Sequence, residues 1–409
     1  MLNRRELITR LRGVLAGALA ATATTGLIGK MALAEHSGPT SREAVALFLA
    51  GDVMLGRGID QILPHPGDPR LYEPSITSAT TYLELAEAAN GTISRPVDFS
   101  YVWCDAIAAL QRAQPDARVV NLETSITKSK QPDPKGINYK MNPENIGCLT
   151  ALKVDCCVLA NNHVLDWGRS GLLETIKALE TAHIAWAGAG PDAARAKLPA
   201  IVDLSGGGKL SIFAFGSASS GISGAWAADG DRPGVNFLNE RSHRAIPDIA
   251  AQTQELRRPG NILMASIHWG DNWGYEVPDE QRQFAHRLID DAGFDVVHGH
   301  SAHHAKGIEV YRRKLILYGC GDFLNDYEGI GGYEAFRDDL AVMYLPRCSI
   351  SSGDLLELTL LPFQIRKFRL NHASSGDVAW LRDTLDRESA KFGSRVALDA
   401  NNTLKVLWK

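Results

Sequence analysis

The sequence predicts an α/β protein with β-sheets covered by helices on both outer faces. Apolar runs typical of strands alternate with helical segments in the first half of the chain, and pairs of strands joined by tight turns follow in the second half. This mixture is typical of sheets packed between layers of helices. Several strands are followed directly by polar residues, which predicts a ligand site at their carboxyl ends.

The composition is that of a globular protein with a large core. Of the 409 residues, 45% are hydrophobic and 22% are charged, and no region is poor enough in apolar residues to predict a long disordered segment. The formal net charge is −4. Because the chain has no basic stripe of the kind that nucleic-acid binding needs, we expect no nucleic-acid partner. The six cysteines match no zinc-binding or Cys-x-x-Cys spacing.

Residues 1–34 have the features of an export signal. Arg4 and Arg5 precede a weakly apolar stretch at 13–29, and Ala32-Leu33-Ala34 has the small residues of a cleavage site. The arginine pair resembles a twin-arginine signal, which exports folded proteins. We therefore expect an exported protein, in the periplasm or at the cell surface. An uncleaved N-terminal membrane anchor is the alternative.

The first half of the chain predicts buried strands separated by helices. The apolar runs are the length of strands, and their polar ends suit the edge of a sheet. Strands are expected at 44–52, 118–123, 156–160 and 184–190, and helices at 105–113, 143–152 and 171–183. Residues 63–98 are rich in Pro, Gly, Ser and Thr and are expected to pass over the active face, with a short helix near 82–89.

The second half predicts two hairpins, further strands and three helices. The hairpins are expected at 198–215 and 308–318, where turn residues separate two apolar runs. The other strands are expected at 262–268, 295–298, 340–345 and 355–362, and the helices at 248–257, 280–292 and 377–392. Residues 217–242 are expected to form a loop.

Five polar motifs follow apolar strands. They are Gly51-Asp52, Asn121-Leu122-Glu123, Asn161-Asn162-His163, His268-Trp269-Gly270 and Gly299-His300-Ser301-Ala302-His303. Ligands bind outside the carboxyl ends of strands in open α/β sheets. Carboxylate, amide oxygen and imidazole are together the donors that suit Mn²⁺, Fe, Zn²⁺ or Mg²⁺. The motifs therefore predict a divalent-metal site with one or two ions.

In this order, the motifs resemble the CapA (poly-γ-glutamate capsule synthesis) family, itself similar to the calcineurin-like metallophosphatases. The resemblance runs from residue 44 to residue 326 and includes Asp166 and Gly168 after the Asn162-His163 pair. It implies a four-layer α/β/β/α sandwich of two mixed sheets over residues 44–330. Residues 331–409 would then be an extension that adds edge strands and a helix.

The resemblance also implies a role for each polar residue. The implied metal ligands are Asp52 and His303 on a first ion, Asn162, His268 and His300 on a second, and Glu123 between them. Asn161 is expected to be structural. His163 would act as the general acid, or would stabilise charge on the leaving oxygen. Asp166 would orient His163, or would only cap the helix that begins near Gly168.

The sequence departs from the family pattern at two positions. Met54 stands where metallophosphatases carry a histidine ligand of the first ion, so a single ion is one alternative. Asp322 stands where the family usually has Asn. His298 and His304 would be extra ligands or solvated residues, and Arg57 could hold an anionic group. The aromatic residues Trp269, Trp273 and Tyr275 would stack on a substrate or pack in a lid.

Two functions are compatible with these features. The first is a metal-dependent hydrolase that acts on a phosphoester or an anionic polymer. The second is a non-catalytic, polymer-binding subunit of a capsule synthesis and export complex at the membrane. A third hypothesis, a degenerate phosphatase fold used for interactions, predicts lost ligands, whereas most are retained. Metal content measured together with turnover distinguishes the three.

Overall fold

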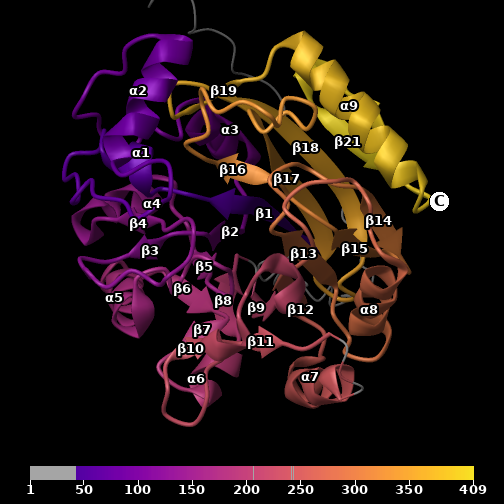
Figure 1. The fold of residues 1–409 in the computed structure, drawn as a ribbon. Helices are drawn as coiled ribbons and strands as arrows, with labels where there is room; N and C mark the ends of the chain where they lie inside the picture. The colour runs from indigo at the N-terminus through magenta and orange to yellow at the C-terminus, as the bar shows by residue number, and fades with distance from the viewer. Residues whose placement is uncertain (1–42, 206, 241, 243) are drawn as a thin grey trace, which may run out of the picture. The chain divides into compact units, whose positions relative to one another are not determined.

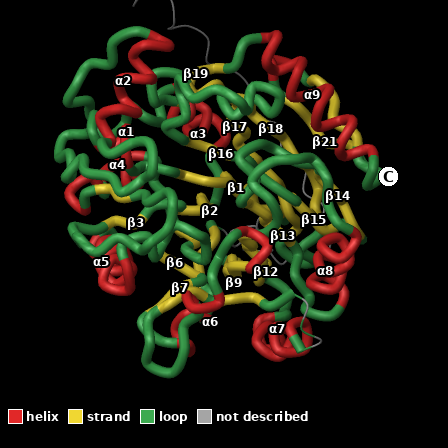
Figure 2. The backbone as a smooth tube through the Cα atoms, in the orientation of Figure 1, coloured by secondary structure: helices red, strands yellow, loops and turns green. Residues whose placement is uncertain are grey.

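The structure is a computed structural model that describes residues 43–409, except residues 206, 241 and 243. The expected export signal lies outside the described residues. Figure 1 shows two large sheets with helices on their outer sides, and Figure 2 shows the same arrangement with the loops that join them. No helix among the described residues is long and apolar enough to cross a membrane.

The first large sheet has a parallel half and an antiparallel half, which meet at β1. The parallel half contains β1 (Ala44–Val53), β2 (Ala117–Leu122), β5 (Cys156–Val158) and β6 (Ala185–Ala187), with β16 (Asp322–Leu324) paired to β1. The antiparallel half contains β17 (Leu340–Ser349), β18 (Leu355–Ile365), β19 (Leu370–His372), β20 (Arg395–Leu398) and β21 (Leu404–Leu407).

The second large sheet is also mixed. Its central strands β9 (Gly208–Ser217), β12 (Asn261–His268), β13 (Val296–His300) and β15 (Lys314–Leu317) run parallel to one another. The strands β8 (Ala200–Leu204) and β14 (Ile308–Tyr311) pair antiparallel to β9 and β15, and β11 (Phe237–Leu238) pairs parallel to β9. Two small sheets pair β3 (Ser125–Ile126) with β4 (Lys140–Met141), and β7 (Ala189–Gly190) with β10 (Gly234–Val235).

Helices cover the outer side of each large sheet. The helices packed on the first sheet include α3 (Asp105–Ala113), α4 (Gly147–Ala151) and α5 (Gly168–Thr181). Those packed on the second sheet include α7 (Ala245–Thr253) and α8 (Asp279–Asp290). The chain also forms α1 (Arg57–Asp60), α2 (Ala79–Asn90), α6 (Ala193–Lys197) and α9 (Ser375–Ala390), and α9 packs against the core between the sheets.

The alternation of side chains along the strands divides the core into layers. In β1, Leu47 and Leu49 lie between the two sheets, whereas Phe48 and Ala50 face the helices. Successive residues of a strand point to opposite faces, so one fully buried strand serves two apolar clusters. Burial of each large apolar side chain contributes about 1.5–3 kcal/mol. The predicted four-layer α/β/β/α fold is confirmed.

The predicted hairpins and most predicted strands and helices are present. The strands β16, β19, β20 and β21, each three or four residues long, are not among the predicted strands. Among the strands after residue 330, β20 forms the edge of the first sheet, whereas β17 lies inside it between β1 and β18. β17 lies there because it pairs antiparallel with β1 from Ala44 to Leu49.

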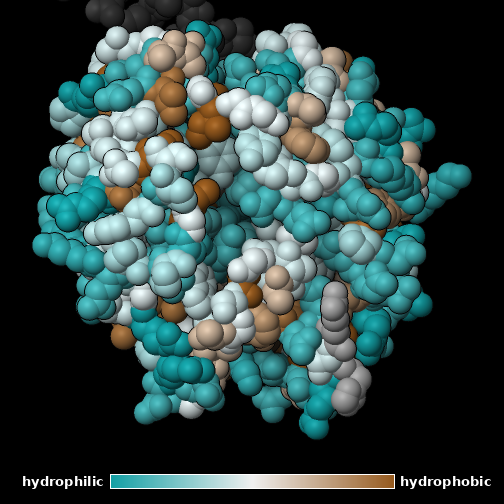
Figure 3. All heavy atoms as spheres, in the orientation of Figure 1, coloured by the Kyte–Doolittle hydropathy of each residue, from teal (hydrophilic) through white to brown (hydrophobic). Residues whose placement is uncertain are grey.

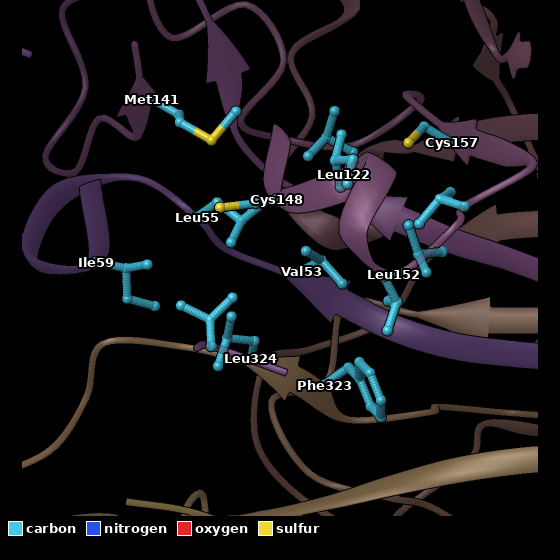
Figure 4. Close-up of a cluster of buried hydrophobic side chains, with 14 of the residues drawn as sticks. Val53, Leu55, Ile59, Leu122, Met141, Cys148, Leu152, Cys157, Phe323 and Leu324 are labelled. Carbon is cyan, nitrogen blue, oxygen red and sulfur yellow. The ribbon is translucent and has the colours of Figure 1, made fainter. Parts of the chain in front are cut away.

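The strand β16 pairs in parallel with the end of β1, where the two backbones approach closely. The backbone N–H of Asp52 donates to the carbonyl of Gly321 (3.1 Å), and Asp52 pairs in register with Asp322. The register of β1 shifts at Asp52, which marks a bulge of the kind that redirects side chains near functional sites. Figure 4 shows Val53 and Phe323, neighbours of these carboxyl groups, in one cluster of buried side chains. This pairing therefore places two carboxyl groups side by side.

Gly51 permits this close approach of β1 to the segment that enters β16, and Gly51→Ala is expected to destabilise the fold. A Cβ at Gly51 would lie 1.9 Å from the carbonyl oxygen of Gly321, whereas one at the exposed Gly136 would meet nothing within 4 Å. Overpacking of this kind costs about 1–3 kcal/mol or more. Chemical denaturation should show a loss of that size for Gly51→Ala and little change for Gly136→Ala. Equal stability of the two variants would contradict the close approach of Gly51 to Gly321.

Candidate metal centre

The predicted site residues lie at the carboxyl ends of strands from both large sheets. They are Asp52 in β1, Glu123 after β2, Asn162 and His163 after β5, His268 at the end of β12, His300 at the end of β13 and His303 beyond it. His300 Nδ1 lies 3.9 Å from Asp52 Oδ1, so the strand ends of the two sheets meet. The face drawn in Figure 3 is hollowed near its middle, close to the place where Figure 1 draws β1.

Two groups of side chains are arranged to hold a metal ion, and they share Asp52. The first group adds His268 and His300, and the second adds His303 and Asp322. Within each group the ligand atoms lie within 4.8 Å of one another, and all these side chains are buried. Carboxylate and imidazole donors at this spacing suit divalent metals.

Glu123 lies beside the first group. Its Oε1 is 3.8 Å from His163 Nε2 and 3.8 Å from His268 Nε2. Asn121 holds Glu123 and Asp52 together, because its Nδ2 donates to Asp52 Oδ1 (2.8 Å) and to Glu123 Oε2 (3.2 Å). Glu123 therefore lies within reach of the first group of side chains and of His163.

Asn161 is structural, as expected. Its Nδ2 donates to Asn121 Oδ1 (2.9 Å) and to the carbonyl of Leu122 (2.8 Å), and its Oδ1 accepts the backbone N–H of His163 (3.1 Å). These hydrogen bonds fix the orientation of the Asn121 amide. Asn161 therefore supports the carboxyl groups indirectly.

Several features of the centre fit a bound cation. His268 Nε2 and Asn162 Oδ1 are buried atoms without a hydrogen-bond partner among the described residues. A buried polar atom left unpaired costs about 1–3 kcal/mol, so such atoms call for a ligand. Asp52, Glu123 and Asp322 are each at most 1% exposed, and close carboxylates repel one another unless a cation lies between them.

The ionisation of the carboxyl groups reflects this crowding. Burial, and then the charge of Asp322, raise the pKa of Asp52 to about 7. Burial and the charge of Asp52 raise the pKa of Glu123 well above its ordinary value. Burial opposes protonation of His303, but the Asp322 carboxylate, 2.8 Å from its Nδ1, outweighs this and raises its pKa. Without a cation, the protein keeps protons on these groups instead.

His163 is oriented by Asp166. The Nδ1–H of His163 donates to Asp166 Oδ2 (2.6 Å), which also accepts the backbone N–H of Tyr139 (2.6 Å). The N-cap of α5 is Trp167, which makes no side-chain capping hydrogen bond, so Asp166 is not the helix cap. His163 Nε2 thus faces Glu123. Burial, which outweighs the Asp166 carboxylate, lowers the pKa of His163 to about 4.

Other predicted residues have structural roles. Arg57 is buried and pairs with Asp326 and Glu73 while its guanidinium stacks over Tyr82, so it is not free to hold an anionic group as predicted. The reason is that these two carboxylates and the ring already occupy the guanidinium, which only the folded chain brings together.

The aromatic residues of the predicted site contribute to packing. Trp269 is 1% exposed and donates to the carbonyl of Tyr318 (3.0 Å), so it belongs to the core. Trp273 stacks on Tyr333 with ring centroids 4.0 Å apart, next to His303 at 5.3 Å. These contacts favour the lid interpretation over substrate stacking for Trp273.

Two residues near the centre were not identified as site residues from sequence patterns. Asp322 is signalled by its Gly-Asp-apolar pattern, which repeats that of Gly51-Asp52. Its position beside Asp52 depends on the pairing of β16 with β1. Lys135 has no such signal. Its Nζ donates to Asp166 Oδ1 (2.7 Å) and to the carbonyl of Asn162, and its side chain is 24% exposed.

Comparisons with known proteins agree with the resemblance. Residues 46–327 match the family described as bacterial capsule synthesis protein PGA_cap. The chain is 47% identical over 367 residues to a probable polyglutamine synthesis accessory protein of Mycobacterium tuberculosis. This alignment covers 89% of this chain and 96% of that protein. It is 26% identical to the PGA biosynthesis protein CapA of Bacillus subtilis, over 74% of this chain and 68% of that protein. Identity to the capsule biosynthesis protein CapA of Bacillus anthracis is 24%, over 74% and 64% of the two chains.

Replacement of Asp52 by Asn is expected to stabilise the metal-free protein at neutral and higher pH. In the unfolded chain the carboxyl group ionises near 3.8, but in the folded protein its pKa is about 7. The wild type therefore loses stability as the pH rises from about 4 to about 7, and the neutral amide does not. One pKa unit corresponds to about 1.4 kcal/mol, so the difference should reach a few kcal/mol.

Denaturation of the EDTA-treated protein between pH 4 and pH 8 measures this difference. Asp248→Asn, which changes an exposed carboxyl group on α7, is the control. If the difference in free energy of unfolding between Asp52→Asn and wild type does not grow with pH, the proposed crowding of carboxyl groups is contradicted.

Proposed function

The chain belongs to the family of bacterial capsule synthesis proteins, and we propose that it is an exported accessory protein of capsule or poly-γ-glutamate synthesis that acts as a metal-dependent hydrolase. The substrate class is a phosphoester or an anionic polymer. The observation that carries this proposal is the meeting of two groups of metal donors next to a histidine held by a carboxylate.

The role in capsule synthesis is supported by the relatives. The Mycobacterium tuberculosis relative is named for polyglutamine synthesis, and both Bacillus relatives are named for capsule or PGA biosynthesis. The first of these aligns over nearly its whole length. A function in the same process, in contact with a synthesis and export complex at the membrane, follows for this chain as a proposal.

Export of the protein is part of the proposal. It rests on the arginine pair, the weakly apolar stretch and the cleavage site within residues 1–34. Removal of these residues takes away five basic groups and one acidic group. The remaining chain is more negative, so an anionic substrate needs a local positive site such as a metal ion.

We assign the two donor groups to two divalent ions of the Mn²⁺, Fe, Zn²⁺ or Mg²⁺ class. Asp52, His268 and His300 of the first group would hold one ion, with Asn162 as a further proposed ligand, and Asp52, His303 and Asp322 of the second group would hold the other. Glu123 is proposed to lie between the two ions. Asp322 supplies the donor that Met54 does not. When bound, the ions supply positive charge that neutralises an anionic substrate group and favours ionisation of water.

His163 is the residue proposed to transfer a proton. Its Nδ1–H is held by Asp166, so the ring presents Nε2 toward Glu123. The low pKa of His163 in the metal-free protein would rise beside an anionic substrate group, because opposite charges favour the protonated ring. In hydrolysis, the oxygen of water bonds to phosphorus and a proton of that water passes to solvent. The bond to the leaving oxygen breaks, and His163 donates a proton to that oxygen.

Lys135 is proposed to support this proton transfer. Its ammonium group contacts Asp166 and remains partly exposed, and its Nζ lies 5.3 Å from the centre of the Trp226 ring. It therefore holds Asp166 in place and adds positive charge on the solvent side of His163.

Replacement of His163 by Ala is expected to abolish hydrolysis while the protein still binds metal. The purified protein is assayed with Mn²⁺ on a generic phosphodiester and on poly-γ-glutamate, with metal analysis of the same samples. General acid–base groups contribute about 10²–10⁴-fold to rate, so a loss of that size is expected. His65→Ala, at an exposed histidine paired with Glu144, should leave turnover unchanged.

The outcome also separates the two functions. Metal binding without turnover in the wild type would replace the hydrolase with a non-catalytic, polymer-binding subunit of the capsule complex. A protein that binds no divalent metal would overturn the proposed centre.

Replacement of Asp322 by Asn tests the second group of ligands. We expect wild type to bind two Mn²⁺ ions per chain and Asp322→Asn to lose or weaken one, because the amide carries no charge. Asp338→Asn, at a nearby half-buried carboxyl group, is the matched control. Calorimetric titration and elemental analysis measure both stoichiometries. If Asp322→Asn binds Mn²⁺ as wild type does, Asp322 serves only as the partner of His303.

A further inference from the structure

A chain of buried hydrogen bonds lies directly beneath the metal ligands. His298 Nε2 lies 3.0 Å from the carbonyl oxygen of Ala50, and His298 Nδ1 lies 3.0 Å from Ser266 Oγ. Ser266 Oγ in turn lies 2.9 Å from His300 Nε2. His298, Ser266 and His300 are each at most 1% exposed, so water does not compete for these hydrogen bonds.

The positions of these residues follow from the pairing of β12 with β13. Ser266 pairs with His298, and His268 pairs with His300. Residues two apart in a strand share a face, so the two pairs form two successive layers on the side that faces β1. The lower layer, Ser266 and His298, lies between the apolar core and the ligands.

The carbonyl of Ala50 determines which group donates and which accepts in each of these hydrogen bonds. A carbonyl only accepts hydrogen bonds, so the proton of neutral His298 is on Nε2 and its Nδ1 is an acceptor. Ser266 must then donate its hydroxyl proton to His298 Nδ1. The Ser266 oxygen is left to accept from His300, which places the proton of His300 on Nε2.

The result is an unprotonated Nδ1 on His300. This nitrogen lies 2.8 Å from His268 Nδ1 and 3.9 Å from Asp52 Oδ1, on the side of the metal centre. A neutral imidazole binds metal only through its unprotonated nitrogen. This chain of hydrogen bonds therefore leaves His300 Nδ1 unprotonated and able to bind a metal ion.

We propose that Ser266 and His298 are positioning residues that hold His300 in its metal-binding tautomer. His298 is thus neither an extra ligand nor a solvated residue, because both of its nitrogens are engaged away from the centre. The contact with Ala50 also joins β13 of one sheet to β1 of the other, two residues before Asp52. Ligands from the two sheets are therefore fixed relative to each other by the same chain of hydrogen bonds.

This inference rests on the proposed metal centre, and Ser266→Ala tests it. Removal of the hydroxyl leaves His300 Nε2 without its acceptor, so both tautomers become accessible. Loss of the group that orients a metal-binding histidine lowers metal affinity about 10–100-fold. Co²⁺ titration, followed by visible absorption, measures the affinity. Ser211→Ala is the matched control, because Ser211 is equally buried on the neighbouring strand β9 and its hydroxyl donates to Asn261 Oδ1 (2.9 Å), away from the candidate metal centre.

Two variants of His298 provide a second test if Ser266→Ala does not fold. His298→Asn keeps an acceptor for the Ser266 hydroxyl, whereas His298→Leu does not. We expect the Asn variant to bind Co²⁺ more tightly than the Leu variant. Equal affinities of these two variants, or wild-type affinity in folded Ser266→Ala, would overturn the proposal.

Nitrogen NMR of histidine in the metal-free protein tests the tautomer without metal. With His300 assigned by its loss in His300→Gln, wild type should show His300 protonated on Nε2, and Ser266→Ala should show a mixture. Protonation of wild-type His300 on Nδ1 would overturn the proposal. A wild type that has the expected tautomer but binds no Co²⁺ would instead refute the proposed function and leave the hydrogen-bond chain intact.

Discussion

The carboxyl groups of Asp52, Glu123 and Asp322 are buried close together, and the surrounding structure is organised around the cost of that crowding. Ionised carboxylates in a place without water are stable only when a cation or protons compensate their charge. Amide donors from Asn121 and the imidazole of His303 provide part of this compensation. The negative charge that these groups leave uncompensated makes the centre suitable for a divalent ion. The unpaired buried atoms His268 Nε2 and Asn162 Oδ1 also belong to the motifs that follow the strands.

The inner face of the second sheet changes in character along its strands. In β12, Ile262 and Met264 belong to the core between the sheets, Ser266 follows on the same face, and His268 ends the strand. The apolar part anchors the strand by burial, while the polar part places ligands with little freedom to move. The same strand thus contributes to stability at one end and to the metal centre at the other.

The positive charges near the centre are divided between structure and site. Arg57 is enclosed by Asp326, Glu73 and aromatic rings, and it ties the start of α1 to the loop after β16. Lys135 keeps part of its surface in contact with solvent and touches the partner of His163. Recognition of an anion at this centre would therefore depend on bound metal and Lys135.

The sequence by itself determined the α/β class, most strands and helices, and the residues Asp52, Glu123, His163, His268, His300 and His303 as site candidates. These features are local, because apolar alternation and polar strand ends can be recognised within a few residues. Only the tertiary structure decided that Asp322 lies beside Asp52, that Asp326 engages Arg57 from 269 positions away, and that both ring nitrogens of His298 are engaged by Ala50 and Ser266. Each of these outcomes depends on contacts between groups that are far apart in the sequence. Local sequence patterns do not specify such contacts.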